Sequence, residues 1–379
     1  MVSLSRFRRK SSAPTKSGSN PGLIGLDISI DHIHLCQIRP LEHGQYAILA
    51  KESIAFSGDR DALLASPKKL KKLVGTALKN NNFKGRKVVA LMPWDEVKII
   101  LLTYKANVTD VDREVLKMLS NRLDGDIDDH VIDYIPVRSN PSDDEHMVVA
   151  TAAPKDKVST LLNALVDCGL EVDSLDIAPT ALRRIVSTLY SGEAADNVLL
   201  INTYFDESYL TIVSGRRLLL NQAVDFGENA MLDRVAAELD ISRKSARGLL
   251  RNHGLEKRRA SAGGSGEIPG SDISATLREI LVPCFLELKE EINRVLIFTA
   301  SETHGVPVSR VCLFGNIAAW PGAFELLLSL LEFDVPDGRI EFLQIFQDEN
   351  DNTRIPWGAM FSDLSIAMGL ALRGLVPNE

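Results

Sequence analysis

The sequence predicts an α/β protein of two lobes, with an α+β subdomain inserted into the first lobe. The chain has 379 residues, more than one hydrophobic core usually serves, so at least two structural units are expected. An apolar strand, a polar break, an alternating strand, a turn and another strand occur in this order twice, from residue 22 and from residue 197. Between these two patterns, residues 86–176 have the order ββαββα.

Composition excludes several classes of protein. Contents of 45% hydrophobic and 25% charged residues are typical of a soluble globular protein, and the net charge of −8 argues against a general nucleic-acid binder. No apolar run reaches the roughly 20 residues of a transmembrane segment, and the first residues lack the apolar core of a signal peptide. The four cysteines are widely spaced in apolar segments, which favours reduced thiols in the cytoplasm over disulfides or a zinc site.

The first elements are a tail and a hairpin. Residues 1–20 are polar and basic, so we expect a disordered tail, with weak attraction to an anionic membrane face as the functional alternative. The segment "GLIGLDISIDHIHLCQI", residues 22–38, predicts strand structure and a hairpin with "YAILAKESIAF" across "LEHGQ". Asp27 interrupts this apolar run. It is either a strand-end acid that bonds its own backbone, or a group that faces a bound phosphate through a metal or water.

Helical and strand patterns continue through the first half of the chain. "DALLASPKKLKKLVGTALKNNN" has leucines at helical spacing. In the inserted segment, "RKVVALMPW" and "VKIILLTY" predict strands, and "TDVDREVLKMLSNRL" predicts a helix with a Thr or Asp cap. "VIDYIPVR" and "HMVVATAAP" predict two further strands, and "KDKVSTLLNALVDCGL" predicts a helix that ends at Gly169.

The second half repeats the opening pattern and then becomes helical. "NVLLINTY", "ESYLTIVSG" and "RRLLLNQAVDF" predict a strand meander, and "NAMLDRVAAELD" and "ISRKSARGLLRNHGL" predict two helices. Residues 256–272 predict a flexible loop, before one long helix or two with Pro283 as the point of a kink. "SRVCLFGNIAAWPGAFELLLSLL" predicts a strand, a turn and a helix, and "SDLSIAMGLALRGL" predicts the last helix.

Seven of these segments stand in the order found in one known family. They are "GLDISIDHIHLCQI", "VVALMPWDEV", "VATAAPKDKVSTLLNALVDCGLEVDSLDIAPTAL", "NVLLINTYFDESYLTIVSGRRLLLNQAVDFGENAM", "ELKEEINRVLIF", "SRVCLFGNIAAWPG" and "LSIAMGLALR". On these segments, over residues 22–374, the chain resembles PilM of type IV pilus assembly and its relative MshI of the mannose-sensitive haemagglutinin (MSHA) pilus. FtsA of cell division is a more distant relative. The resemblance implies a two-lobed, actin-like ATPase (ribonuclease H-like) fold.

The resemblance also implies the domain boundaries and an inherited nucleotide site. The expected units are a tail (1–20), the opening of the first lobe (21–85), the inserted subdomain (86–176), a return to the first lobe (177–196), the second lobe (197–353) and a C-terminal helix on the first lobe (354–379). The nucleotide-binding positions carried over are Asp27, Ser29, Asp31, Asn202, Thr203, Asp206, Gly227, Lys289, Gly315 and Asn316.

The three nucleotide loops depart from the family pattern. In the first loop Asp31 adds a carboxylate beside the expected phosphate oxygens, a repulsion of about 4 kcal/mol at ~4 Å and an effective dielectric of ~20. In the second loop Asn202 replaces an Asp, and Tyr204 replaces a Gly, so that its ring would occupy phosphate space. The adenosine loop keeps Gly315 but follows it with Asn316 instead of a further Gly. These changes shrink the pocket or make it more negative.

We therefore expect a scaffold without catalytic residues and without a bound cofactor. The family implies a place on the cytoplasmic face of a Gram-negative inner membrane. It also implies binding of the N-terminal segment of a PilN- or MshJ-like bitopic protein, together with other inner-membrane platform components. The expected peptide groove involves the "RKVVALMP" strand and the "TDVDREVLKMLSNRL" helix. The alternative is an ATP-binding or ATP-hydrolysing switch, in which Mg-ATP or ADP binds and Asp27 holds the metal. A sugar or acetate kinase would require an intact second loop.

Two other patterns were weighed as metal sites. Asp124, Asp126 and Asp128 alternate as in a calcium loop, but Asp129 stands where Gly is required, so a solvated turn is expected. His32 and His34 share one strand face, but no third ligand is near, so an ordinary exposed pair is expected.

Overall fold

The computed structural model describes residues 21–137, 144–189, 197–215, 217–256, 271–331, 346–348 and 364–376. The basic tail, most of the expected flexible loop and much of the stretch between residues 332 and 363 lie outside these ranges.

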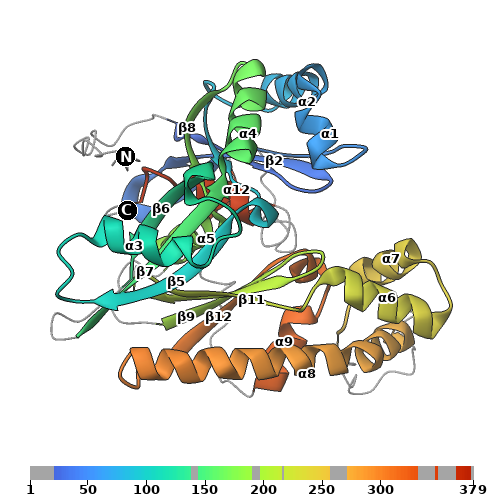
Figure 1. The fold of residues 1–379 in the computed structure, drawn as a ribbon. Helices are drawn as coiled ribbons and strands as arrows, with labels where there is room; N and C mark the ends of the chain where they lie inside the picture. The colour runs from blue at the N-terminus through green and yellow to red at the C-terminus, as the bar shows by residue number, and fades with distance from the viewer. Residues whose placement is uncertain are drawn as a thin grey trace.

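The two lobes are built as five alternating layers of helices and sheets (Figure 1). Helices α1 (Arg60–Leu64), α2 (Pro67–Asn80) and α4 (Lys155–Asp167) cover the outer face of the first sheet. Helices α5 (Ala178–Leu189) and α12 (Ser365–Ala371) lie between the two sheets. Helices α6 (Glu228–Leu239), α7 (Arg243–His253), α8 (Ser271–Glu302) and α9 (Ala323–Leu331) cover the far side of the second sheet. Each sheet thus buries both faces.

The first-lobe sheet has the strand order β13-β3-β2-β1-β4-β8. Its strands are β1 (Ile24–Ile28), β2 (His32–Pro40), β3 (Tyr46–Ala55), β4 (Lys87–Leu91), β8 (Glu171–Asp176) and β13 (Phe346–Asp348). The opening segment forms two antiparallel strands, and β3 completes the expected hairpin across the 3-10 turn η1 (Glu42–Gly44). Strand β4 pairs in parallel with β1, and β8 pairs in parallel with β4 at the edge of the sheet. The interior position of β4 explains its continuous apolar run.

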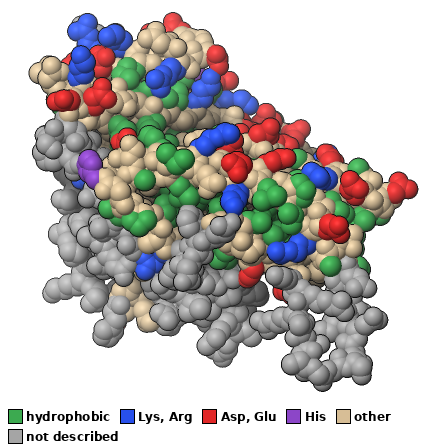
Figure 2. Space-filling view, turned by 90° about the horizontal axis from the view of Figure 1, so that it is seen from below, with side chains coloured by type: hydrophobic (Ala, Val, Ile, Leu, Met, Phe, Trp, Pro, Cys, Tyr) green, Lys and Arg blue, Asp and Glu red, His purple; other side chains and the backbone are tan. Residues whose placement is uncertain are grey.

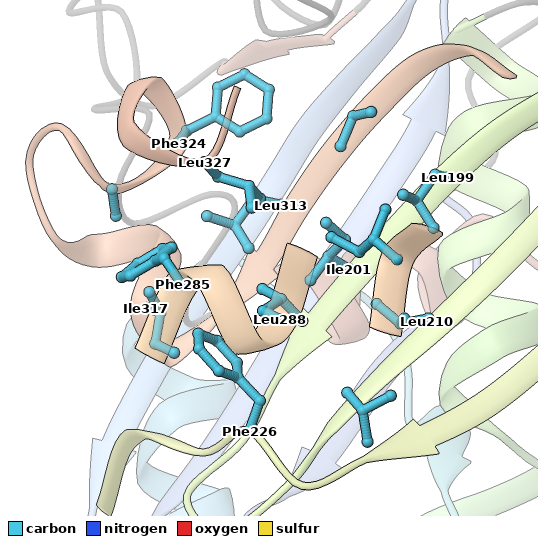
Figure 3. Close-up of a cluster of buried hydrophobic side chains, with 14 of the residues drawn as sticks. Leu199, Ile201, Leu210, Phe226, Phe285, Leu288, Leu313, Ile317, Phe324 and Leu327 are labelled. Atoms are coloured by element: carbon cyan, nitrogen blue, oxygen red, sulfur yellow. The ribbon is translucent and has the colours of Figure 1, made fainter. Parts of the chain in front are cut away.

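The second-lobe sheet has the order β11-β10-β9-β12. Its strands are β9 (Asn197–Thr203), β10 (Ser208–Ser214), β11 (Arg217–Val224) and β12 (Val308–Gly315), followed by the 3-10 turn η4 (Asn316–Ala319). Leu199, Ile201 and Leu210 of this sheet pack against Phe285 and Leu288 of α8 (Figure 3). Helix α8 continues through Pro283 as one element, so the alternative of two helices is not observed. The serine cap and glycine stop of α7 are found at Ser242 and Gly254.

The inserted subdomain is a three-stranded sheet with one helix. Its strands, in the order β5-β7-β6, are β5 (Lys98–Lys105), β7 (Glu145–Pro154) and β6 (His130–Pro136), and helix α3 (Val111–Ser120) packs on one face. The short turns η2 (Trp94–Glu96) and η3 (Ile127–Asp129) flank it. Our sequence analysis counted the "RKVVALMPW" strand with this subdomain. The structure places that strand, β4, inside the first-lobe sheet, because its apolar side chains are buried on both faces there.

The C-terminal helix α12 closes the first lobe through backbone contacts. A Cβ atom on Gly25 of β1 would lie 1.9 Å from the carbonyl oxygen of Ala367, and one on Gly369 would lie 2.2 Å from that of Ala181. Only glycine therefore permits this approach. After the helix, Arg373 donates to the buried Asp176 carboxylate at 2.8 Å, beside the bond from Arg184 at 2.6 Å. Burial raises the pKa of Asp176, but the two arginines outweigh this effect and hold it below its usual value.

No helix in the described ranges is long and apolar enough to cross a membrane. Figure 2 views the molecule from below, the side on which α8 lies in Figure 1. Hydrophobic side chains on this face lie among acidic and basic ones. The large hydrophobic residues of α8 that are exposed, among those described, are Ile273, Leu286 and Ile297.

Candidate functional site

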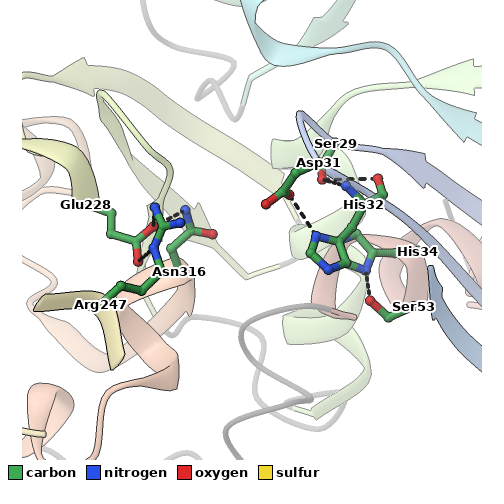
Figure 4. A network of polar contacts seen from close by, with 8 residues as sticks. All are labelled: Ser29, Asp31, His32, His34, Ser53, Glu228, Arg247 and Asn316. Atoms are coloured by element: carbon green, nitrogen blue, oxygen red, sulfur yellow. Dashed lines mark hydrogen bonds and ion pairs between the residues drawn. The ribbon is translucent and has the colours of Figure 1, made fainter. Parts of the chain in front are cut away.

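A cavity lies where the loops of the two lobes face each other. It encloses an empty volume of about 890 Å³, part of which is open to solvent. Seven of the expected nucleotide-site residues line it, namely Asp27, Ser29, Asp31, Asn202, Thr203, Gly315 and Asn316. Figure 4 shows the two walls, with Ser29, Asp31 and His32 on one side and Glu228, Arg247 and Asn316 on the other. The loops expected to converge on a nucleotide therefore do converge.

The first loop, between β1 and β2, closes on itself. The backbone N–H of Ser29 donates to the carbonyl of His32 at 2.9 Å, and the N–H of His32 donates to the Ser29 hydroxyl at 3.2 Å. The Ser29 hydroxyl in turn donates to the His32 carbonyl at 3.2 Å. Phosphate loops bind their ligand through backbone N–H groups that point into the site. In this loop both of these N–H groups are already bonded within the protein.

The second loop, between β9 and β10, packs against the N-terminus of helix α6 and bonds its first N–H groups. The N–H of Glu228 donates to the carbonyl of Tyr204 at 3.0 Å, and the N–H of Asn229 donates to the carbonyl of Phe205 at 2.7 Å. The loop also closes internally, since the N–H of Tyr204 donates to the carbonyl of Glu207 at 3.0 Å. The first N–H groups of a helix are its anion-binding groups. Here two of them are satisfied by the loop that stands where a phosphate loop is expected.

The third loop joins β12 to η4 and packs against Thr203. The Thr203 hydroxyl donates to the carbonyl of Phe314 at 2.9 Å and accepts from the N–H of Ile317 at 3.1 Å. Gly315 has φ +85°, and a Cβ atom on it would lie 2.0 Å from the carbonyl oxygen of Thr203. Gly315 and Thr203 therefore hold strands β9 and β12 together at the floor of the cavity.

An aromatic contact joins the lobes across the cavity. The ring of Trp94, from η2 beside the first lobe, stacks on the ring of Tyr204 in the second lobe with 5.2 Å between centroids. Tyr209 meets both rings edge-on, at 6.4 Å from Trp94 and 5.9 Å from Tyr204. Burial raises the pKa of the Tyr204 hydroxyl above its usual value. Tyr204, which stands where the resemblance leads us to expect a glycine, thus forms part of an aromatic wall between the lobes.

A second, mainly apolar cavity lies behind this aromatic wall. It has an empty volume of about 340 Å³ and shares Trp94 and Tyr204 with the first cavity. Val97 and Ile99 at the start of the inserted subdomain line one side, and Leu182 of α5 lines another. Three parts of the chain therefore meet here: the first lobe, the inserted subdomain and the second lobe.

Asp27 lies at the end of β1, where both interpretations of the sequence placed it. Its side chain is buried, which raises its pKa from 3.8 to about 7, while the nearby Arg60 acts in the opposite direction. Arg60 is itself buried and donates to the Asp95 carboxylate at 2.7 and 2.8 Å and to Glu96 at 3.2 Å. Within the described residues, the Asp27 carboxylate makes no hydrogen bond to its own backbone, contrary to the structural alternative.

The histidine pair departs from our expectation in one respect. The rings of His32 and His34 share a face and stack with 5.6 Å between centroids, but His34 is buried and bonds the Ser53 hydroxyl at 3.0 Å. His32 bonds the Asp31 carboxylate at 2.8 Å, and this bond lowers the pKa of Asp31. The described residues contain no cluster of three Asp, Glu, His or Cys side chains placed to hold a metal ion. The expectation that both histidines are exposed was therefore wrong.

The opposite wall carries a buried carboxylate with basic partners. Glu228 is 1% exposed and accepts from Arg247 at 3.2 and 3.3 Å and from the Asn316 amide at 3.2 Å. Burial raises the pKa of Glu228, and Arg247 and Arg251 oppose this shift. The Arg247 guanidinium also lies 5.6 Å from the centroid of the Phe205 ring. An ion pair therefore lies within this wall, next to the third loop.

Three of the expected residues do not line the cavity. Gly227 is the N-cap of α6, Asp206 accepts from the Asn229 amide at 2.9 Å, and Lys289 lies on α8. Sequence reasoning missed the lining residues Arg60, Trp94, Arg247 and Arg251. The spacing of Arg247 and Arg251, four positions apart in a helix, was the one available signal, because it places them on the same face.

A family model described as type IV pilus assembly protein PilM matches residues 25–375. The chain belongs to the PilM family. The solved structure of a PilM–PilN type IV pilus biogenesis complex is similar, with a TM-score of 0.71 and 17% identity over 94% of this chain and 99% of that one. The ethanolamine utilization protein EutJ from Carboxydothermus hydrogenoformans has a TM-score of 0.52 and 10% identity over 95% of this chain and 92% of its own.

A comparison with curated protein sequences finds no significant match. The PilM family assignment and the similarity to the PilM–PilN complex confirm the expected actin-like ATPase fold. The protein is therefore a PilM-like type IV pilus assembly protein.

Proposed function

We propose that this PilM-family protein is a scaffold on the cytoplasmic face of a Gram-negative inner membrane that works without a nucleotide. The observation that carries this proposal is the internal bonding of both phosphate loops. N–H groups of Ser29, Tyr204 and Glu228 donate to protein carbonyls, and the Tyr204 ring stacks on Trp94. The inherited site therefore fits Mg-ATP or ADP poorly. Asp27, the residue that would hold Mg²⁺, is a buried carboxyl with its pKa raised to about 7.

The proposed partner is the N-terminal cytoplasmic segment of a PilN-like, or MshJ-like, inner-membrane protein. The similarity to the chain of a PilM–PilN complex supports this partner. The structure narrows the groove expected from the sequence. Strand β4 is buried inside the first-lobe sheet, but Met92 near the end of the "RKVVALMP" segment lines the apolar cavity, whereas none of the described residues of α3 does. The apolar cavity beside Val97, Ile99 and Leu182 is a better place for an apolar side chain of such a peptide. The altered loops favour an MSHA-type pilus over other type IV systems.

A calorimetric titration tests this proposal. The protein is titrated with a synthetic PilN-type N-terminal peptide and, separately, with Mg-ATP. We expect peptide binding in the absence of ATP and no heat from Mg-ATP. Ile99→Ser should weaken peptide binding, whereas the matched control Ile132→Ser, on the face that α3 covers, should not. Absence of peptide binding would refute the scaffold proposal. Micromolar Mg-ATP binding would refute the proposal that the nucleotide site is degenerate.

The alternative function, a nucleotide-gated switch, is favoured by one observation. Arg60, Arg247 and Arg251 all line the cavity and could attract an anion. If Mg-ATP binds and Asp27 holds the metal, Asp27→Ala should abolish that binding. Unchanged ATP binding in this variant would show that the inherited metal position is not used.

A further inference from the structure

One segment of the first lobe has a charge opposite to that of the whole protein. Between Pro67 and Lys87 there are eight basic residues and no acidic ones, although acids outnumber bases by eight in the chain. All eight side chains are exposed. We call them the α2 basic face: Lys68, Lys69, Lys71, Lys72, Lys79, Lys84, Arg86 and Lys87.

Helix α2 presents this face outward. Its buried side consists of Leu70, Val74 and Ala77, and at about 100° per residue Lys68, Lys72 and Lys79 point in the opposite direction. Figure 1 places α2 at the outer end of the first lobe, on the side away from the second lobe. The lysines therefore face solvent along a helix roughly 21 Å long.

These charges are not neutralised within the described part of the chain. None of the eight forms an ion pair there, whereas Lys157 on the neighbouring α4 pairs with Asp61 and Glu96 at 3.2 Å. Lys69 donates to the carbonyl of Ser57 at 2.7 Å, and Arg86 donates to that of Gly169 at 3.4 Å, but carbonyls leave the positive charge in place. The face therefore keeps a concentrated positive potential.

The charges also oppose the local stability of the helix. The first turn of α2 contains Lys68 and Lys69 and no acid, although the N-terminus of a helix favours negative charge. Lys68 lies three and four positions before Lys71 and Lys72, spacings at which like charges destabilise a helix. The lysines of α2 thus break the charge preferences of a helix, and no ion pair among the described residues compensates for this. Such exceptions are expected where residues serve binding.

Gly22, near the beginning of the described residues, lies beside this face. The buried Gln37 amide donates to the carbonyls of Gly22 and Lys84, both at 2.8 Å, and its oxygen accepts from the N–H of Lys84 at 2.7 Å. Gly22 is therefore fixed next to the basic link between α2 and β4. The sequence before it, residues 1–20, is basic as well.

We propose that the α2 basic face docks on anionic lipid headgroups and orients the protein on the membrane. This inference deepens the membrane-peripheral location given in the proposed function and rests on it. Lysine is a hydrated point charge suited to headgroup phosphates, and seven of the eight residues are lysines. The only aromatic residue between Pro67 and Lys87, Phe83, is buried, so this face lacks the stacking side chains of a single-strand nucleic-acid site. The rest of the protein has a net negative charge and is repelled by the same membrane, so the protein binds with the α2 basic face toward the lipid.

Vesicle sedimentation of the full chain tests this inference. The vesicles contain phosphatidylglycerol and phosphatidylethanolamine, and pure phosphatidylcholine vesicles are the neutral comparison. The test variant carries Lys68→Gln, Lys71→Gln and Lys72→Gln. The matched control carries Lys105→Gln, Lys117→Gln and Lys244→Gln, which are exposed lysines on other elements, so both variants change the net charge equally. Glutamine has a helix propensity similar to that of lysine, so α2 is retained.

We expect the test variant to bind anionic vesicles roughly 100-fold more weakly than the parent, and the control to bind nearly as the parent does. Added salt should weaken parent binding. Four outcomes would overturn the inference. The first two are equal losses of binding in both variants and equal binding of the parent to neutral vesicles. The other two are no vesicle binding by the parent and its preferred binding to an oligonucleotide or acidic peptide. The PilN-type peptide is titrated into the same proteins. Retained peptide binding without vesicle binding refutes the membrane face alone, and the reverse refutes the proposed peptide partner alone.

Discussion

Single residues decide how the cavity between the lobes behaves. Tyr204 contributes its carbonyl to the start of α6 and its ring to the contact with Trp94. A glycine at this position would supply the carbonyl but not the ring. The Tyr204 side chain therefore adds an interlobe contact at the edge of the cavity.

Asp27 makes the stability of the protein depend on pH. Its pKa is 3.8 in the unfolded chain and about 7 in the fold, so the folded state holds this proton more tightly. The stabilisation is fully present below pH 3.8 and is lost as the pH rises through 7. Asp27→Asn removes this loss. The difference in the free energy of unfolding between this variant and the parent should increase by roughly 2–3 kcal/mol from pH 5 to pH 8. Urea unfolding at the two pH values measures it. An equal difference at both pH values would contradict the buried, protonated state.

The sequence identified Asp27 but not its surroundings. Composition and spacing show that an acid interrupts an apolar strand, and the family places that acid near a ligand. Arg60 stands 33 positions later and reaches the site only because α1 packs on the first-lobe sheet beside η2. Glu228 and Arg247 likewise meet through the packing of α6 against α7. Such contacts depend on tertiary structure and leave no periodic signal.

At the scale of elements, two helical glycines should respond oppositely to the same substitution. Gly75 is exposed in α2, and a Cβ atom on it would meet nothing within 4 Å. Gly75→Ala should therefore raise the free energy of unfolding by about 0.5–1 kcal/mol, because alanine is the better helix former. Gly369→Ala in α12 should lower it by more than this amount, since its Cβ would lie 2.2 Å from the Ala181 carbonyl oxygen. Thermal unfolding of both variants measures the two signs, and a stabilising Gly369→Ala would mean that α12 does not pack as described.

Most elements were predictable because hydrophobic periodicity is local. The helices at "PKKLKKLVGTALKN" and "RKSARGLLRNH" and the meander of the second lobe occur where the pattern placed them. The sheet to which β4 belongs was not predictable. A strand that is apolar on both faces can lie in the interior of any sheet. The pairing of β4 with β1 shows that it belongs to the first-lobe sheet.

At the scale of the whole molecule, the aromatic wall should couple the two lobes. A double-mutant cycle of Trp94→Leu and Tyr204→Leu is expected to give a coupling energy of about 1 kcal/mol in urea unfolding. The single variant Trp94→Leu should also speed hydrogen exchange at the amides of the second loop. His146→Leu, which removes the edge contact with Tyr104 inside the inserted subdomain, is the control and should leave that exchange unchanged. A coupling energy near zero would mean that the stacked rings do not hold the lobes together.

The contact of α12 with β1 has a consequence for synthesis of the chain. Residues 24–28 are synthesised long before residues 365–371, yet Gly25 packs directly against Ala367 and Ala371. The first lobe therefore cannot complete its core until α12 has been synthesised. A chain that terminates before α12 keeps this apolar surface open to chaperones and proteases, so α12 distinguishes molecules with a closed first lobe from truncated ones.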